Sequence, residues 1–404
     1  MRLHRNLVYT TIDSLNFIFN EGEYADKIVA KALKKDLRWG AKDRKFVAET
    51  IYEIVRWKRL YAEIAEVKEP YNREDLWRMF AVWAVLRGYP IPDWTQLEGT
   101  PNRRIKGRFE ELSKIRKYRE SIPDWMDELG AKELGEALWT KEISAQNEQA
   151  KVILRVNTLK TTKEKLRAIL MDLDIDTEIV KEYPQALVLK ERANVFMTDA
   201  FKEGFFEVQD ASSQMVAEML DVEPGMRVID TCAGAGGKTL HIANLMENKG
   251  QLIAMDLYES KLKQLKIRAK RNGVFNVEYR IIDSTKVIKK LHEKADRILI
   301  DAPCSGLGVL KRNPDAKWKL QPEFIDNIKQ IQADILERYS KMLKPGGKMV
   351  YATCSVLPSE NENQVALFLQ NNPDFKLVKQ KKVLAHQSGF DGFYMAQMIR
   401  DSKD

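Results

Sequence analysis

Acidic and sulfur-bearing residues follow a glycine-rich turn in the C-terminal half of the chain. An apolar run ends at Asp230, and the turn after it carries Gly234, Gly236 and Gly237 before a helical pattern begins at Thr239. Glycines allow a tight turn and let backbone N–H groups approach a ligand without a Cβ in the way. A strand that passes through such a turn into a helix is typical of a nucleotide-binding unit.

The spacing of these glycines excludes the two common phosphate-binding patterns. A phosphate loop that ends in the Gly-Lys-Thr of residues 237–239 needs a glycine where the chain has Cys232. A dinucleotide fingerprint that starts at Gly234 needs a glycine in place of the threonine at 239. The acid before the turn, Asp230, suits a ligand with a cationic head better than a pyrophosphate. We therefore expect S-adenosylmethionine, which has a sulfonium and an ammonium group, as the cofactor.

The other predicted strand ends carry further acids and cysteines. Asp256 closes the second strand at the distance from the glycines where a carboxylate binds both ribose hydroxyls, and Asp283 closes the third, in reach of the adenine. Asp301 opens a glycine-bearing loop that contains Cys304, and Cys354 lies where a later strand meets a turn. Ligands collect at the carboxyl ends of strands in doubly wound sheets, so we expect these residues to line one site.

Cysteine at this edge offers a thiolate nucleophile if nearby positive charge lowers its pKa from about 8.5. Lys238, Lys311 and Arg312 are candidate sources of that charge. A thiolate that adds to carbon 6 of a pyrimidine makes carbon 5 nucleophilic enough to accept a methyl group; a base then removes the carbon 5 proton and the thiolate leaves. Asp301 is placed to hydrogen-bond the N3/N4 edge of the ring, and the target base must be unstacked. These residues fit either cysteine as the nucleophile.

Composition bounds the class of protein. The 404 residues have a net charge of +8, which permits a polyanionic partner such as RNA. No apolar run is long enough to cross a membrane, and the first residues lack the apolar region of a signal peptide, so we expect a cytoplasmic protein. Three widely separated cysteines and four scattered histidines form no metal-binding spacing, so we expect no metal. We also expect a monomer.

The pattern along the chain predicts three domains. Residues 1–140 read as an all-helical RNA-binding domain, because apolar residues recur at three- and four-residue spacing; its many aromatic residues are expected in the core. Residues 141–207 predict a small α+β subdomain, a common platform for single-stranded RNA. Residues 208–404 predict an α/β catalytic domain, with a doubly wound, mainly parallel, seven-stranded Rossmann-like sheet.

The predicted strands of this sheet lie at 226–231, 251–256, 277–282, 296–301, 347–353, 374–378 and 392–399. The last two lack a helix between them, so we expect an antiparallel hairpin at the edge of the sheet. A long helix is predicted from about 321 to 343, where a Pro-Gly-Gly stop precedes the fifth strand.

Basic residues in three places are candidate RNA contacts. Residues 101–120 contain eight Lys or Arg against three acids, a local net charge of +5, although a solvated basic helix fits this stretch equally well. Two more candidates end the first strand of the α+β subdomain, and two follow the Cys304 loop. The individual candidates are Arg103, Arg104, Arg155, Asn157, Lys311 and Arg312.

In combination, the motifs resemble the Nop/Sun family of RNA cytosine-5 methyltransferases. They are Asp-x-Cys-Ala-Gly-x-Gly-Gly-Lys-Thr at 230–239, Asp-Ala-Pro-Cys-Ser-Gly-x-Gly at 301–308, Asn-Pro-Asp-x-Lys-Trp at 313–318 and Tyr-x-Thr-Cys-Ser at 351–355, with Val-Gln-Asp-Ala-Ser-Ser at 208–213 and Asp-Gly-Phe-Tyr at 391–394. The helical part, with Asp-Arg-Lys-Phe at 43–46 and Val-Arg-Trp at 55–57, resembles the antitermination-factor-like domain of bacterial members.

This resemblance implies methyl transfer from S-adenosylmethionine to carbon 5 of a cytosine in RNA, most directly 16S ribosomal RNA, through a covalent adduct between cysteine and carbon 6. It implies that Cys354 is the nucleophile and that Cys304 assists product release. Ala235 stands where many members have proline, and alanine keeps the turn feasible. The implied cofactor contacts, mainly by backbone, are Cys232, Ala233, Gly234, Ala235, Gly236, Gly237 and Lys238, together with Asp256, Asp283 and Asp301.

Two alternatives remain open from the sequence. One is the same chemistry on tRNA or DNA. The other is an RNA chaperone or ribosome-assembly factor in which catalysis is secondary. The presence of Asp301, Cys304 and Cys354 together argues against the second alternative, because a scaffold needs none of them.

Overall fold

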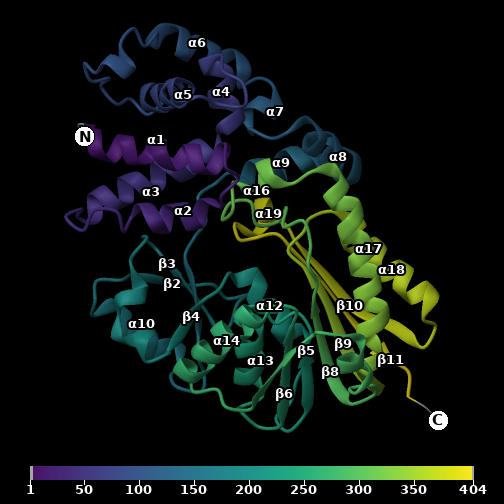
Figure 1. Cartoon of the computed structure of the whole chain (residues 1–404). Coiled ribbons are helices and arrows are strands. Elements are labelled where there is room, and N and C mark those ends of the chain that lie inside the picture. Colours follow the sequence, from purple (N-terminus) through teal and green to yellow (C-terminus); the bar gives the residue numbers. More distant parts are fainter. Residues whose placement is uncertain (1–2, 403–404) are drawn as a thin grey trace. The chain divides into compact units, whose positions relative to one another are not determined.

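The computed structural model describes residues 3–402 and divides into two compact units (Figure 1). Unit 1 comprises residues 1–148 and 310–322, and unit 2 comprises residues 149–309 and 323–404. In unit 2 the small α+β part and the large sheet belong to one body. The three-domain division at 140 and 207 stays a prediction. Within residues 3–402, no helix combines the length and the apolar character needed to span a membrane.

Unit 1 is helical, as its apolar spacing predicts. Its helices are α1 (Arg5–Phe19), α2 (Ala25–Ala32), α3 (Ala41–Arg56), α4 (Lys58–Ala65), α5 (Arg73–Leu86), η1 (Thr95–Leu97), α6 (Asn102–Leu112), α7 (Arg116–Arg119), α8 (Asp124–Leu134), α9 (Glu136–Gln146) and α16 (Ala316–Lys319).

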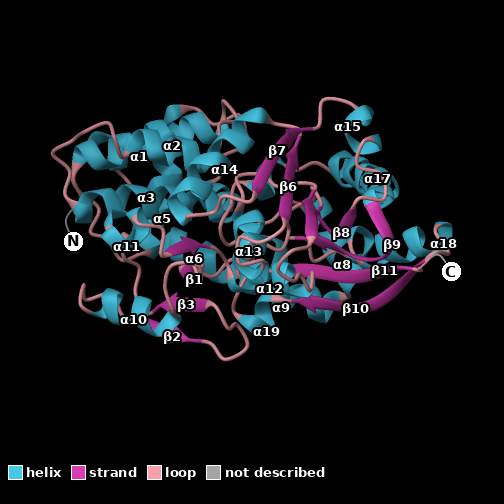
Figure 2. Cartoon of the chain, turned by 90° about the horizontal axis from the view of Figure 1, so that it is seen from below, coloured by secondary structure: helices cyan, strands magenta, loops and turns pink. Residues whose placement is uncertain are grey.

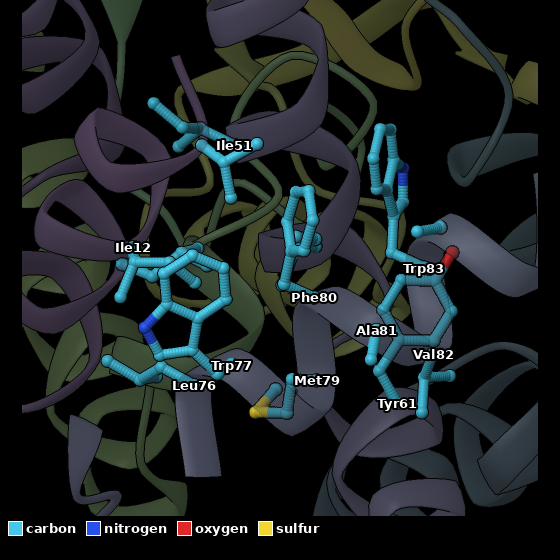
Figure 3. Packing of buried hydrophobic residues seen from close by; sticks show 14 of the residues in the cluster. Ile12, Ile51, Tyr61, Leu76, Trp77, Met79, Phe80, Ala81, Val82 and Trp83 are labelled. Atoms are coloured by element: carbon cyan, nitrogen blue, oxygen red, sulfur yellow. The ribbon is translucent and has the colours of Figure 1, made fainter. Parts of the chain in front are cut away.

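Helix α5 forms the centre of this unit. It begins with a capping box, in which the Asn72 side chain accepts from the backbone N–H of Asp75. Its aromatic side chains are buried and pack on one another: the rings of Trp77 and Phe80 lie 6.1 Å apart, and those of Phe80 and Trp83 lie 5.1 Å apart. Figure 3 shows these rings in the buried cluster, with Ile12 of α1 next to Trp77. For these aromatic residues of α5, the prediction that they belong to the core is confirmed.

The segment 310–322 belongs to unit 1, although in the sequence it follows the Cys304 loop. Lys317 in this segment is buried, and its side-chain nitrogen Nζ makes three hydrogen bonds. The acceptors are the carbonyl oxygens of Arg56 (2.9 Å) and Glu120 (3.2 Å) and the side-chain oxygen of Asn147 (2.9 Å). The charged form of lysine has three N–H donors, which this cage can satisfy, while burial lowers the pKa of Lys317 well below its ordinary value.

The large sheet of unit 2 has the strand order β10-β11-β9-β8-β5-β6-β7 (Figure 2). Its strands are β5 (Arg227–Asp230), β6 (Gln251–Asp256), β7 (Val277–Ile281), β8 (Ala295–Asp301), β9 (Leu343–Thr353), β10 (Phe375–Val383) and β11 (Phe393–Arg400). Neighbours from β7 to β9 pair in parallel, whereas β11 runs antiparallel to both β9 and β10. The predicted seven-stranded sheet and its antiparallel edge hairpin are confirmed.

The remaining helices of unit 2 pack around its sheets. They are α10 (Lys163–Met171), η2 (Val195–Met197), α11 (Asp199–Lys202), α12 (Ala211–Met219), α13 (Gly237–Leu245), α14 (Glu259–Asn272), α15 (Thr285–Lys289), α17 (Pro322–Tyr339), η3 (Ser340–Met342), η4 (Pro358–Glu360), α18 (Glu362–Asn371) and α19 (Ala385–Ser388).

The boundary between α17 and β9 differs from the prediction. The helix ends at Tyr339, not 343, and β9 begins at Leu343, so the Pro-Gly-Gly of residues 345–347 lies inside the strand. Proline has no N–H to donate to the ladder. The pairing of β9 with β8 shifts register between Ala295 and Arg297, and this irregularity accommodates the missing donor.

The small sheet of unit 2 has the order β2-β3-β1-β4, with β1 (Ile153–Val156), β2 (Thr177–Ile179), β3 (Ala186–Leu189) and β4 (Phe206–Val208). Every residue of β1 and β3 is buried. Leu154 packs in a cluster with Leu166 of α10, and Ile153 packs on the other side with Ala211 and Phe390. The predicted RNA platform is wrong in one respect, since neither face of these central strands is open for bases to stack on.

Candidate active site

The carboxyl ends of five neighbouring strands bring the predicted site residues to one edge of the large sheet. Asp230, Asp256 and Asp301 are the last residues of β5, β6 and β8. Cys354 directly follows β9, whose Ala352 pairs with Asp301 in parallel register. The topology places these residues together because parallel strands end at the same edge.

Two arginines hold the glycine turn from behind. Arg155 of β1 donates to the carbonyl of Gly237, and Arg268 of α14 donates to the carbonyl of Ala235 at 2.6 Å. Arg268 is itself fixed by an ion pair with buried Glu207 of β4 at 2.8 Å. The carbonyl groups of the turn therefore have partners within unit 2.

The turn has the shape of a cradle. A Cβ added at Gly234 or Gly237 would meet nothing within 4 Å, whereas one at Gly236 would lie 2.0 Å from Leu265 of α14. Gly236 also has a φ of 91°, which side chains rarely adopt. Packing and backbone conformation thus favour glycine at 236, while Gly234 and Gly237 face open space.

Asp256 and Asp283 flank this cradle. Asp256 accepts from the backbone N–H of Gly234 and of Tyr258, both at 2.8 Å, so its carboxylate links the turn to the end of β6. Asp283 follows β7 and is exposed. Both carboxylates suit the hydroxyls and amines of a nucleoside, and their roles stay predictions.

Asp230 lies beneath the turn and is buried. Thr239 donates to one of its oxygens at 2.7 Å. Burial raises the pKa of Asp230 to about 7, because desolvation penalises the charged carboxylate more than the Thr239 hydrogen bond stabilises it. Asp230 therefore gains or loses its proton near neutral pH.

Lys238 and Asp301 form an ion pair at 2.7 Å. Burial lowers the pKa of Lys238, but the charge of Asp301 and its hydrogen bond outweigh burial, so the net pKa is raised and the ammonium form is favoured. Cys354 is also near enough to contribute to this electrostatic field. Lys238 was one of three candidate sources of positive charge near the nucleophilic cysteine, and its charge interacts with Cys354.

The two cysteines of the strand-end loops lie together. The sulfur atoms of Cys304 and Cys354 are 3.3 Å apart, and both thiols are free. The hydrogen bond with Cys354 and burial raise the pKa of Cys304 well above its ordinary value. Cys304 is therefore a protonated thiol that can donate a hydrogen bond to a thiolate at Cys354.

Cys232 differs from these two. It lies inside the glycine turn, and burial raises the pKa of its thiol far above the ordinary value. A thiol in that state is a poor nucleophile. The prediction that Cys232 serves the turn through its backbone, and not as a third nucleophile, is consistent with this burial.

Comparison with known proteins agrees with this geometry. Residues 217–399 match the family described as 16S rRNA methyltransferase RsmB/F, and residues 122–196 match the ferredoxin-like domain of RsmF/B-like methyltransferases. The "Probable ribosomal RNA small subunit methyltransferase B" of Synechocystis sp. is 32% identical over 406 residues, which cover 92% of this chain and 90% of that protein. The chain belongs to the RsmB/F methyltransferase family.

Other relatives match this RsmB/F family member over different shares of their own length. The ribosomal RNA small subunit methyltransferase B of Serratia proteamaculans is 37% identical over 272 residues, which span 65% of this chain and 63% of that protein. The crystal structure of PH0851 covers 99% of this chain at a TM-score of 0.84 and 26% identity, and all of that chain is matched. A methyltransferase homolog protein from Pyrococcus horikoshii has a TM-score of 0.64 and 27% identity, over 72% of this chain and 99% of its own.

Arg155 and Asn157 of the RsmB/F family member are not available as RNA contacts. Each side chain is only 1% exposed. The Arg155 guanidinium bonds Gln209 and the glycine turn, and the Asn157 amide donates to the carbonyl oxygens of Gly204 (2.7 Å) and Asn272 (2.9 Å). These two predictions are wrong, because both polar side chains fasten the small sheet to the methyltransferase core.

The other predicted RNA contacts divide by exposure. Lys311 is 3% exposed, so that prediction is also wrong, and Arg312 is half-buried. Arg103 and Arg104 lie exposed on α6, where Arg104 forms an ion pair with Glu66, the residue after α4, at 2.6 Å. Most of the excess charge of residues 101–120 is similarly paired with carboxylates of unit 1, as in the pairs of Arg108, Arg116, Lys117 and Arg119. Arg103, Arg104 and Arg312 stay predictions.

Sequence reasoning missed Glu360 and the serines that follow the two cysteines. Ser305 and Ser355 are buried, and both donate a hydroxyl to the Glu360 carboxylate. The available signal was the repeated Cys-Ser pair followed by an acid in the turn after β9. Its meaning depends on the fold bringing two distant loops together.

Proposed function

We propose that this protein transfers a methyl group from S-adenosylmethionine to carbon 5 of a cytosine in 16S ribosomal RNA. The observation that carries the proposal is the 3.3 Å separation of the Cys304 and Cys354 sulfurs, beside the Lys238–Asp301 ion pair. Two thiols and an acid at the strand ends match the needs of nucleophilic activation of a pyrimidine. Family membership supports RNA of the small ribosomal subunit as the substrate.

In this proposal the glycine turn holds the cofactor. The backbone of residues 232–238 would hold it, with Asp256 at the ribose and Asp283 at the adenine. The open space at Gly234 and Gly237 and the carboxylate at the end of β6 support this assignment. When bound, S-adenosylmethionine supplies the methyl group and leaves as S-adenosylhomocysteine.

The residues of the chain carry the other steps. Cys354, as a thiolate whose proton has passed to solvent, adds to carbon 6, and the ring electrons displaced by this bond make carbon 5 nucleophilic. Lys238 stabilises the thiolate, and Asp301 binds the N3/N4 edge where charge develops. Carbon 5 gains the methyl group and loses its proton to water. The electron pair of that C–H bond restores the double bond between carbons 5 and 6, and the Cys354 sulfur leaves as a thiolate with the electron pair of the C6–S bond.

Cys304 assists this last step in the proposal. Its S–H group donates a hydrogen bond to the Cys354 sulfur as negative charge returns there. A serine hydroxyl in its place would be a shorter donor at a site spaced for sulfur. The helical residues 1–140 would contribute RNA binding, with Arg103, Arg104 and Arg312 as the remaining candidate contacts.

Two variants test the proposal on unmodified 16S ribosomal RNA. Cys354→Ala should abolish methyl transfer while binding of S-adenosylhomocysteine changes little, because the nucleophile is lost and the cradle is not. Cys304→Ser should accumulate a protein–RNA adduct that survives denaturant. The double variant should show no adduct, which controls for nonspecific trapping.

Bisulfite sequencing of the treated RNA identifies the methylated base. Full activity of Cys354→Ala would move the nucleophile to Cys304, and absence of the adduct in Cys304→Ser would remove its role in release. Methylation of a tRNA pool with none on 16S ribosomal RNA would change the substrate. Binding of 16S ribosomal RNA without methyl transfer to any RNA would favour the assembly-factor alternative.

A further inference from the structure

Glu360 of η4 is a buried carboxylate between the two cysteine loops. It is 0% exposed, and it accepts four side-chain or backbone hydrogen bonds. One oxygen accepts from the hydroxyls of Ser305 and Ser355, both at 2.5 Å, and the other accepts from the backbone N–H of Ser305 at 2.8 Å and the amide of Gln332 at 3.0 Å. A carboxylate with two bonds on each oxygen is fully satisfied without solvent.

The Cys304 loop is held on both sides of the cysteine. The residue before it, Pro303, accepts at its carbonyl from the Gln332 amide at 2.9 Å. The residue after it, Ser305, bonds Glu360 through both its N–H and its hydroxyl. Gln332 also bonds Glu360, so one connected network sets the path of this loop.

The Cys354 loop is held by the same turn. Ser355 donates its hydroxyl to Glu360, and its carbonyl accepts from the side chain of Asn361 at 2.9 Å. Thr353, on the other side of the cysteine, donates to the Asn361 side-chain oxygen at 2.5 Å. Glu360 and Asn361 thus connect residues on both sides of Cys354 with the residue after Cys304.

We propose that Glu360 is a positioning residue that sets the separation of the Cys304 and Cys354 sulfurs. Only the expected loss of methyl transfer rests on the proposed function. The distance between the two sulfur atoms can be tested on the protein without RNA or cofactor. Glu360 is the carboxylate that bonds both loops directly, and its two oxygens cannot serve both serines unless the loops approach each other. Displacement of a reacting group by about 1 Å can lower a rate on the order of 100-fold.

Two substitutions separate the length of the side chain from its charge. Glu360→Asp keeps the charge but is one methylene shorter, so it cannot reach both loops. Glu360→Gln keeps the length, and the serine hydroxyls can turn to accept from its amide, so the spacing should survive. Glu362→Gln is the matched control, since this neighbouring carboxylate pairs with Lys382 of β10.

Disulfide formation measures the spacing without RNA or cofactor. The full-length protein is treated with diamide, and the rate at which the Cys304–Cys354 disulfide forms is followed by mass spectrometry of its peptides. We expect a several-fold slower rate in Glu360→Asp, a wild-type rate in Glu362→Gln, and a rate in Glu360→Gln that is no slower than wild type, because its spacing is kept and the Cys304 thiolate is opposed by one charge less. A wild-type rate in Glu360→Asp would overturn the proposal, as would a rate in Glu362→Gln as slow as that of Glu360→Asp.

Methyl transfer and thiol reactivity complete the test. The kcat of Glu360→Asp should fall by roughly 100-fold while its affinity for S-adenosylhomocysteine stays near the wild-type value. An equal loss of cofactor affinity would overturn the positioning role in favour of general disruption. In Glu360→Gln, iodoacetamide should modify Cys304 faster than in wild type, because a nearby negative charge that opposes its thiolate is gone; an unchanged rate would exclude an electrostatic contribution from Glu360.

A second pair of variants applies if Glu360→Asp does not fold. Ser305→Ala and Ser355→Ala each remove one hydroxyl from the network and leave the carboxylate in place. We expect each to slow diamide cross-linking, and the double variant to slow it by less than the product of the two effects, because both act through one acceptor. Wild-type rates in all three would overturn the proposal. If wild-type protein methylates no RNA, the proposed function fails, but the cross-linking rates still decide the role of Glu360.

Discussion

Substitution by alanine should have different effects at Gly234 and at Gly236. Alanine at Gly236 places a Cβ 2.0 Å from the Leu265 side chain at a backbone φ of 91°. Alanine at Gly234 has a φ of 55°, within the left-handed region, and meets nothing within 4 Å. We expect Gly236→Ala to destabilise unit 2 and Gly234→Ala to leave it folded but impair cofactor binding.

The structure gives the size of each effect. Strain at positive φ costs about 1–3 kcal/mol, and overpacking against a buried leucine adds about 1–3 kcal/mol, so Gly236→Ala should cost about 2–6 kcal/mol of unfolding free energy. Gly234→Ala should cost only about 1–2 kcal/mol. Its methyl group projects into the space proposed for the cofactor. A steric cost of about 1–3 kcal/mol there raises the Kd for S-adenosylhomocysteine about 5- to 160-fold.

The assay must report on unit 2. All eight tryptophans lie in unit 1, so tryptophan fluorescence follows the wrong unit. They are Trp39, Trp57, Trp77, Trp83, Trp94, Trp125, Trp139 and Trp318. Scanning calorimetry measures both units, and titration calorimetry with S-adenosylhomocysteine measures the cradle. Wild-type affinity in Gly234→Ala would refute the placement of the cofactor, and wild-type stability in Gly236→Ala would refute the packing of the turn on α14.

Two further predictions concern buried titratable groups. Lys317→Met should lower the melting temperature of unit 1, read by tryptophan fluorescence, because three buried acceptors lose their donor, at about 1–3 kcal/mol each before relaxation; an unchanged transition would contradict the role of the 310–322 segment in that unit. The pKa of Asp230 is raised to about 7 by burial, above its unfolded value of 3.8, so the folded state binds this proton more tightly. Its contribution to stability is present below the unfolded pKa and is lost as pH rises toward 7. Asp230→Asn keeps an acceptor for Thr239 and should be more stable than wild type above pH 7 by calorimetry, with a smaller decline from acid to neutral pH; parallel pH profiles would refute this.

Short stretches of sequence determined much of the candidate active site at the edge of the large sheet. The glycine turn, the strands before it and the acids at strand ends are each encoded within a few residues, by apolar runs and turn chemistry. Alternating strands and helices then imply a parallel sheet, and parallel strands end at one edge. Asp230, Asp256 and Asp301 could therefore be assigned to one site before any distance was known.

Partners of long polar side chains could not be determined in this way. Arg155 and Asn157 looked like surface contacts, yet they bond residues 82 and 115 positions away in the sequence. Most of the carboxylates that pair with the bases of residues 101–120 lie outside that stretch, including Glu66 directly after α4 and Asp127 of α8. A short stretch of sequence therefore does not predict which acidic side chain pairs with a given basic one.

The sequence by itself thus determined the fold class, the cofactor turn and the two cysteines as candidates for chemistry. The tertiary structure decided how these parts are held: Arg155 behind the turn, the 310–322 segment in unit 1, and Glu360 between Cys304 and Cys354. The physical reason is that backbone conformation responds to neighbours along the chain. The environment of a buried polar group is instead set by whatever packing brings within hydrogen-bond distance.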